Sequence, residues 1–85
     1  MRYVIKIKST ALKELDRVPS YISERATDVI NHFSIDQRPR GCKKLTGENN
    51  LWRVKVGEYR VIYEIDDFQK LIRIRRFLHR KEAYR

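Results

Sequence analysis

The sequence contains few of the residues that build cross-linked, metal-bound or nucleotide-binding sites. Its single cysteine, Cys42, excludes an internal disulfide framework and a cysteine-based metal site, and we expect it to be a buried or half-buried small residue. With three glycines, the chain lacks a glycine-rich loop for nucleotide phosphates. His32 and His79 lie far apart in the sequence, and no group of His, Asp and Glu has the spacing of metal ligands. We therefore expect no metal, no cofactor and no small-molecule ligand.

Long apolar runs are also missing. The N-terminal residues resemble neither a signal peptide nor a membrane span, so we expect a cytoplasmic protein without a membrane partner. The length of 85 residues leaves room for one domain, which we expect to cover residues 1–85. An apolar content of 41% is enough for a globular core, although a thin one.

Acidic side chains are in deficit. Eleven Asp and Glu oppose twenty Lys and Arg, which gives a net charge of +9. The excess is uneven, because residues 69–85 contain seven basic side chains and one acidic one. A solvated, highly soluble surface would explain a basic composition alone. The clustering instead favours a polyanion as the partner, with nucleic acid foremost.

The first half of the chain predicts a strand and two helices. Residues 3–8 alternate as a strand does, with Tyr3, Ile5 and Ile7 on one face. A short helix follows, capped by Ser9 or Thr10 and stopped by Pro19, and a second helix starts at a capping Ser20. The apolar residues recur with helical spacing, so the two helices form an antiparallel hairpin with one apolar face: Ala11, Leu12, Leu15, Val18, Ile22, Ala26, Val29, Ile30 and Phe33.

The second half predicts a loop and three strands. Residues 35–50 hold turn-forming residues and one candidate edge strand at 43–45, and strands are expected at 51–56, 59–66 and 71–78. Trp52, Tyr59 and Tyr63 alternate with aliphatic residues, so we assign them to the core.

The order strand, two helices, three strands predicts an α+β fold, in which the helical hairpin packs on one face of a twisted, mainly antiparallel sheet. The other face is then free to be polar. We expect Arg53, Lys55 and Arg60 to point out of it, which would give a polyanion an open basic surface.

The segment Gly57-Glu-Tyr-Arg-Val-Ile-Tyr63 resembles a motif of the RelE/ParE superfamily of toxin–antitoxin toxins. The strand 51–56 before it and the ending Leu78-His-Arg-Lys-Glu-Ala-Tyr84 fit the same family. Lys43-Lys-Leu-Thr-Gly47 and Ala11-Leu-Lys-Glu-Leu15 fit as well. The resemblance covers nearly the whole chain, in the same order.

The resemblance implies the same α+β fold and two possible activities. RelE-type toxins enter the ribosomal A site and cleave mRNA without a metal, by attack of a ribose 2′-hydroxyl on the adjacent phosphate. ParE-type toxins act on DNA gyrase instead and lack the basic catalytic set. The implied partners of a RelE-type chain are the ribosome, mRNA and a cognate inhibitory antitoxin protein.

Metal-free cleavage needs a base for the 2′-hydroxyl, cations for the phosphorane and a proton for the leaving oxygen. By the resemblance, Arg60 contacts the phosphate, although it could instead be a cross-strand partner of Glu58 or Glu64. Lys55 matches a lysine that activates the nucleophile, unless it is only a solvated strand residue. Arg53 departs from relatives that carry a lysine there, and arginine is a poor base.

The C-terminus supplies the rest of the implied site. Arg80 would stabilise or protonate the leaving oxygen, and Tyr84 would stack on a base unless it closes the core. Lys81 or Arg76 could replace Arg80, because spacing in this tail varies. His79 is a candidate acid or base, or a structural residue. The expected catalytic residues are Lys55, Arg60, Arg80 and Tyr84, and the expected RNA-binding residues are Arg53, Lys43, Lys44, Arg76, His79 and Lys81.

Three functions remain open at this point. The favoured one is a metal-independent, ribosome-dependent mRNA endonuclease that stops translation. A gyrase inhibitor is the second, but it gives the basic set no task. A non-catalytic RNA-binding module is the third. The first depends on convergence of the strand cations and the C-terminal tyrosine on one concave surface.

Overall fold

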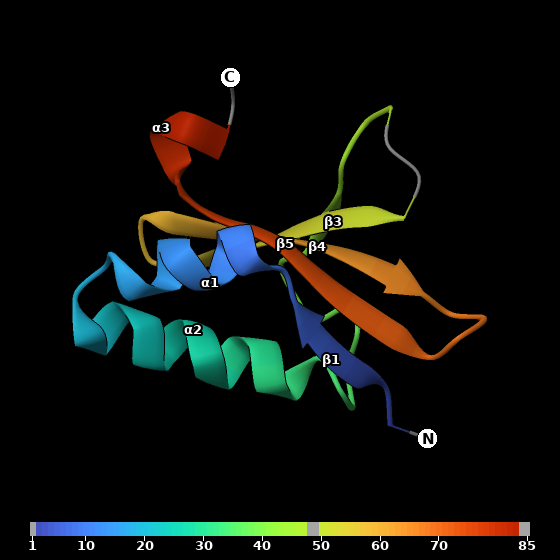
Figure 1. Ribbon diagram of the computed structural model, residues 1–85. Helices are drawn as coiled ribbons and strands as arrows, with labels where there is room; N and C mark the ends of the chain where they lie inside the picture. The colour runs from blue at the N-terminus through green and yellow to red at the C-terminus, as the bar shows by residue number, and fades with distance from the viewer. Residues whose placement is uncertain (1, 48–49, 84–85) are drawn as a thin grey trace.

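The computed structural model describes residues 2–47 and 50–83 as a helix-covered sheet. Five strands form one sheet in the order β1-β5-β4-β3-β2. Helices α1 and α2 lie on one side of this sheet and the short α3 lies on the other (Figure 1). The elements, in chain order, are β1 (Val4–Ile7), α1 (Ser9–Asp16), α2 (Ser20–His32), β2 (Lys43–Lys44), β3 (Leu51–Val56), β4 (Tyr59–Asp66), β5 (Leu71–His79) and α3 (Arg80–Ala83).

The sheet confirms the predicted fold class and is mainly antiparallel. The pairs β2–β3, β3–β4 and β4–β5 are antiparallel, whereas β1 runs parallel to β5 with Val4 opposite Leu71. The candidate edge strand is present as β2, and β5 extends one residue beyond the predicted end, to His79. No helix among the described residues is long and apolar enough to cross a membrane.

The core lies between the sheet and the two long helices. Phe33 at the end of α2 and Tyr63 on β4 are fully buried, and their rings stack with centroids 4.1 Å apart. The Tyr63 hydroxyl donates a hydrogen bond of 2.9 Å to the backbone oxygen of Gln37, and burial raises the pKa of this phenol. The half-buried Trp52 and Tyr59 pack against the same core, as predicted from their alternation.

The predicted helix caps are wrong. Ser9 and Ser20 are the first residues of their helices, and the preceding Lys8 and Pro19 make no side-chain capping bond. The reason at α1 is that the β-ladder continues for one more residue: the Lys8 backbone N–H donates to the Ile74 carbonyl. Helical backbone therefore begins at position 9 itself.

Leu12 also differs from the prediction, because it is 48% exposed. Helix α1 packs on the sheet through Ala11 and Leu15, which are both buried. Position 12 is rotated by roughly 100° from position 11, which carries its side chain away from that contact.

Glu14 on α1 closes the edge of β5 beyond the end of β1. Its carboxylate accepts a hydrogen bond of 2.9 Å from the Phe77 backbone N–H. The same carboxylate binds the Arg76 guanidinium, with the shortest distance 2.7 Å, and so raises the pKa of Arg76. The Glu14 side chain thus binds a backbone N–H of β5 that would otherwise need a neighbouring strand, and it also neutralises the charge of Arg76.

Replacement of Glu14 by alanine should lower the free energy of unfolding by about 1–3 kcal/mol, because the Phe77 N–H loses its acceptor and Arg76 its counter-charge. Urea titration measures the change. Glu14→Gln should lose less, since its amide oxygen can still accept from Phe77. Asp16→Ala, at an exposed position of the same helix, is the control. Equal stability of the Glu14→Ala and Asp16→Ala variants would contradict the role given to Glu14.

Candidate functional site

The sheet face turned away from α1 and α2, called the outer face below, gathers most of the strand-borne cations. Cross-strand partners point to the same side of a sheet. Lys55 is opposite Arg60, which is in turn opposite Leu78. The next row contains Lys43, Arg53 and Ile62. These rows place four of the predicted site residues side by side on three neighbouring strands.

Three of these cations line one pocket. Lys43, Arg53 and Lys55, together with Gly41 and Val54, surround a pocket of about 220 Å³ at the β2–β3 edge. Lys43 and Lys55 are exposed, and Arg53 is half-buried. The strand alternation therefore predicted the direction of Arg53 and Lys55 correctly. Such a pocket presents up to three positive charges to one ligand.

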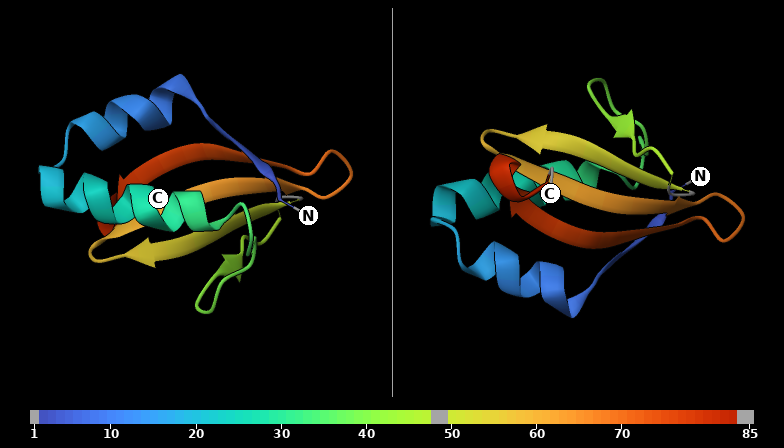
Figure 2. Two further views of the ribbon diagram at one scale, coloured as in Figure 1. Left: turned by 90° about the horizontal axis from the view of Figure 1, so that it is seen from below. Right: turned by 90° about the horizontal axis from the view of Figure 1, so that it is seen from above.

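Arg60 shares this face but differs from the prediction of an outward, exposed side chain. It is 6% exposed, and its Nη1 donates a hydrogen bond of 3.1 Å to the backbone oxygen of its neighbour Tyr59. Arg60 is on the central strand β4, between Lys55 and Leu78 on the two neighbouring strands. Helix α3 contacts β4 and β5 near this end of the sheet (Figure 2, right). Burial fixes the direction of this guanidinium.

The C-terminal candidates lie beside the outer face. The Arg80 backbone N–H donates to the Glu58 carbonyl at 2.7 Å, and the Arg80 Nε is 2.9 Å from the Glu58 carboxylate. These contacts attach the start of α3 to the turn between β3 and β4. Lys81 is exposed on α3. Tyr84 lies outside the described residues.

The remaining candidates lie elsewhere. Lys44 is opposite Trp52 and His79 is opposite Tyr59, so both belong to the helix-covered side. The His79 ring meets Tyr59 edge-on at 5.4 Å, and its Nδ1 accepts from the Lys81 backbone N–H at 3.3 Å. Arg76 reaches the Glu14 carboxylate at the edge of the sheet. Lys44 and His79 therefore do not share the outer face with Lys43 and Arg53, and Arg76, whose register partner Ile62 is on that face, turns to Glu14 instead.

A second basic pocket was not predicted from the sequence. Lys6, Lys8, Arg73 and Arg75, together with Ile7, line a pocket of about 440 Å³ at the β1–β5 edge. Lys6 is opposite Arg73 in the parallel pair. The basic residues of β5 were visible in the sequence, but their neighbours on β1 depend on a pairing between the two ends of the chain. No local pattern indicates that pairing.

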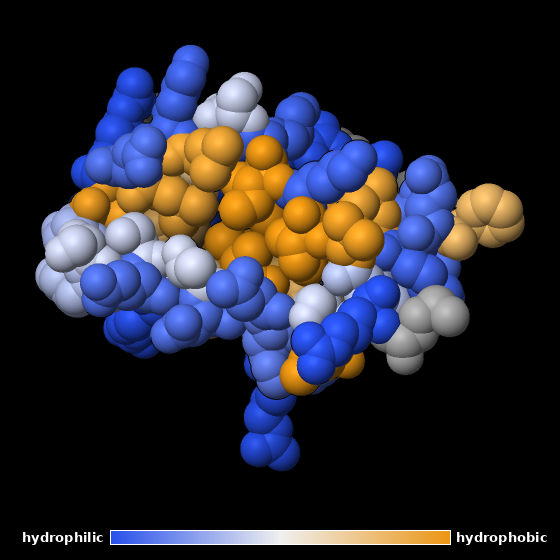
Figure 3. All heavy atoms as spheres, turned by 60° about the horizontal axis from the view of Figure 1, so that its bottom comes forward, coloured by the Kyte–Doolittle hydropathy of each residue, from blue (hydrophilic) through white to orange (hydrophobic). Residues whose placement is uncertain are grey.

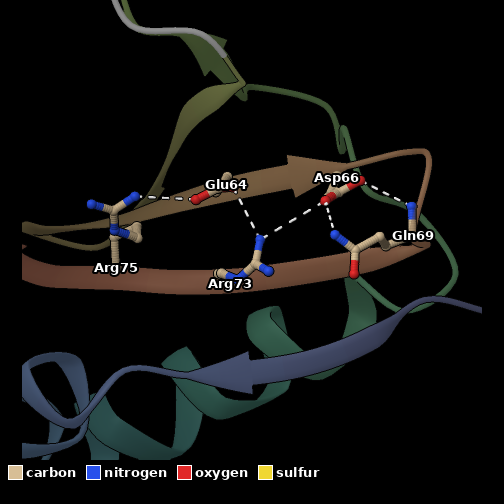
Figure 4. A network of polar contacts seen from close by, with 5 residues as sticks. All are labelled: Glu64, Asp66, Gln69, Arg73 and Arg75. Atoms are coloured by element: carbon tan, nitrogen blue, oxygen red, sulfur yellow. Dashed lines mark hydrogen bonds and ion pairs between the residues drawn. The ribbon is translucent and has the colours of Figure 1, made fainter.

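Acidic residues of β4 hold the arginines of this second pocket (Figure 4). The two oxygens of Glu64 accept hydrogen bonds of 3.1 Å from Nη1 of Arg73 and from Nη1 of Arg75. Asp66 is 4.0 Å from Arg73 and also accepts from Gln69 at 2.9 Å. The network orients both guanidinium groups along the outer face.

The two faces of the sheet differ in character. Apolar side chains gather in the middle of the side that carries α1 and α2, with hydrophilic residues around them (Figure 3). The outer face instead carries the two basic pockets. In residues 2–47 and 50–83, no group of three or more His, Cys, Asp or Glu is arranged to hold a metal ion. The chemistry available at the outer face is binding of anions and stabilisation of negative charge.

Comparisons with known proteins agree on one kind of relative. The family model described as the ParE toxin of the type II toxin–antitoxin system parDE matches residues 5–84. The chain is 35% identical over 79 residues to Toxin RelE3 of Methanocaldococcus jannaschii, with 88% of each chain covered. It is 29% identical over 84 residues to Toxin RelE of Mycobacterium tuberculosis, covering 98% of this chain and 87% of the relative. A chain of the archaeal RelE–RelB complex from Pyrococcus horikoshii OT3 superposes with a TM-score of 0.84 at 29% identity, covering 94% of this chain and 97% of that one.

Proposed function

Since this chain belongs to the RelE/ParE superfamily of toxins of type II toxin–antitoxin systems, we propose that its activity is ribosome-dependent cleavage of mRNA in the A site. One observation carries the proposal. The exposed Lys55 lies directly opposite the buried Arg60, and the same outer-face pocket contains Lys43 and Arg53. Inhibition of gyrase gives this cluster of cations no task, whereas cleavage of RNA requires positive charges beside the scissile phosphate.

The chemistry divides between Lys55 and Arg60. Side chains on directly opposed strand residues have Cβ atoms about 4.5–5.5 Å apart, so one phosphodiester can be in reach of both. Arg60 supplies a fixed guanidinium for the negative charge that develops on the phosphorane. Lys55 takes the proton from the 2′-hydroxyl, and that oxygen then attacks the phosphorus and expels the 5′-oxygen. A 2′,3′-cyclic phosphate remains on the upstream fragment.

The other candidates take supporting roles. Arg53 and Lys43 bind phosphate beside the reacting group, because arginine keeps its proton and suits binding better than base catalysis. Arg80 stabilises the negative charge on the leaving 5′-oxygen, which takes a proton from water, and the ion pair of Arg80 with Glu58 has to open for this contact. Tyr84 stacks on a base of the mRNA.

We also propose a cognate antitoxin protein as the inhibitory partner, supported by the RelE–RelB complex among the structural relatives. An acidic segment of that partner would neutralise the cations around Lys55 and block entry into the ribosome. An activity on ribosomes places the free toxin in the cytoplasm. The whole chain, residues 1–85, would act as one domain.

Primer extension on mRNA with purified ribosomes tests the proposal. The purified protein should produce new stops within codons when ribosomes are present, and few or none on the same mRNA alone. The double variant R53Q/K55Q should lose these stops, whereas K13Q/R17Q, with the same loss of charge on α1 and at the residue after it, should keep them. Absence of ribosome-dependent stops with the parent protein would refute the proposal.

A supercoiling assay with purified gyrase addresses the second candidate, which the description of the matching family model favours. The expected result is unchanged supercoiling at concentrations that stop translation. Inhibition of gyrase without cleavage of mRNA would replace the proposed function by the ParE-type activity.

A further inference from the structure

We propose that Lys6, Lys8, Arg73 and Arg75 form a second binding site for the phosphate backbone of RNA, on the same face as the cleavage pocket but at the opposite edge of the sheet. The proposal deepens the proposed function, since it names a second contact for the same class of substrate. It rests on a pocket of about 440 Å³ that these four cations line together with Ile7.

The site joins two distant parts of the chain. Lys6 on β1 is the register partner of Arg73 on β5. Arg75 follows at the shift of register between β4 and β5, and its guanidinium reaches Glu64 on the outer face. Arg73 and Arg75 both bind the same carboxylate. The two arginines of the pocket are therefore held in place by Glu64, and the pairing of β1 with β5 brings the two lysines beside them.

Glu64 orients the two arginines and leaves most of their N–H donors available for a ligand. Each guanidinium carries five N–H donors, and Glu64 is bound through Nη1 of each. Four basic residues oppose Glu64 and Asp66, so the local charge is +4 − 2 = +2. Held arginines lose less side-chain entropy when they bind a phosphate, and their planar fork matches phosphate oxygens.

The spacing of the two pockets suits a strand of RNA. Three steps between neighbouring strands separate β1 from β3, which corresponds to about 14 Å at ~4.8 Å per step. The register places Lys6 and Arg73 level with Leu51, four residues from Lys55, which adds about 13 Å along the strands. A backbone that crosses the outer face diagonally from the Lys55 pocket would reach Arg73 and Lys6. An acidic protein is the weaker fit, because the centre of a protein interface is usually apolar and this lining contains one apolar residue.

The double variant K6Q/K8Q tests the site. Both lysines are exposed, and their replacement leaves the ion pairs of Glu64 in place. Binding of a short single-stranded RNA is measured by fluorescence anisotropy between about 50 and 200 mM salt. Loss of two phosphate contacts should reduce the slope of log affinity against log salt by about 1.4. K13Q/R17Q, with equal charge loss on α1 and at the residue after it, should keep the parental slope.

A second arm with vacant ribosomes separates the two sources of RNA phosphate. A reduced slope with the oligonucleotide assigns the site to the mRNA strand, and a reduced affinity for ribosomes alone assigns it to ribosomal RNA. Both results support the site. Equal effects of K6Q/K8Q and K13Q/R17Q, or a loss of antitoxin binding with RNA binding unchanged, would overturn it.

The outcome is independent of the cleavage assay. If the parent protein cuts mRNA on ribosomes and K6Q/K8Q binds RNA as the parent does, the second site is wrong and the proposed function remains. If the parent protein does not cut mRNA and K6Q/K8Q still shows the reduced slope, the proposed function is wrong and the second site remains.

Discussion

Replacement of Arg60 by methionine is expected to slow mRNA cleavage on ribosomes by about 100- to 1,000-fold while the protein stays folded. The rate falls because a fixed positive charge no longer faces the phosphorane. The fold persists because Arg60 is 6% exposed, and an apolar side chain of similar length fills the same space without the cost of burying a charge. Single-turnover cleavage at saturating ribosomes measures the chemical step separately from binding.

Two further variants sharpen this test. Arg60→Lys keeps the charge but loses the planar fork and its contact with the Tyr59 carbonyl, so an intermediate rate is expected. Arg17→Met removes a positive charge from the exposed end of α1 and should cut at the parental rate. Full activity of Arg60→Met with an unchanged melting temperature would show that Arg60 is not needed for cleavage and that Lys55 acts with other cations.

The burial of Arg60 also shows where prediction from sequence ends. Alternation along β3 and β4 correctly separated the residues that face α1 and α2 from those that do not, because period two is a local property of a strand. Whether an outward residue meets solvent depends on its neighbours. Arg60 is buried on a strand that is central in the sheet, and the place of β4 in the strand order does not follow from the residues around position 60.

The same reasoning applies to the two basic pockets. The Lys55 pocket joins β2 and β3, which are close in sequence, and its three basic residues, Lys43, Arg53 and Lys55, were all expected site residues. The Lys6 pocket depends on the parallel pairing of β1 with β5, which brings together residues more than sixty positions apart. The shift of register at Ile62 and Tyr63 changes the pattern again, since adjacent Arg75 and Arg76 reach Glu64 and Glu14. Such long-range pairing has no signature in one sequence.

Replacement of Phe33 by alanine is expected to lower the free energy of unfolding by about 3–5 kcal/mol, the usual cost of removing a buried aromatic ring. Phe33 is fully buried and stacked on Tyr63, so the surrounding helix and strand cannot collapse into the space. A domain of this length has a total stability of about 4–13 kcal/mol. The loss should therefore lower the melting temperature by about 12–40 °C.

Comparison of Phe33→Ala with Arg60→Met separates stability from chemistry. Phe33→Ala should regain cleavage when the assay is cooled into the range where the variant is folded, since it leaves the outer face intact. Arg60→Met should remain slow at every temperature. Phe68→Ala, at a position that is 96% exposed, should match the parent within about 0.5 kcal/mol. A Phe33→Ala variant as stable as Phe68→Ala would mean that the α2–β4 contact is not the centre of the core, and the sheet would then need another explanation for how it holds Lys55 opposite Arg60.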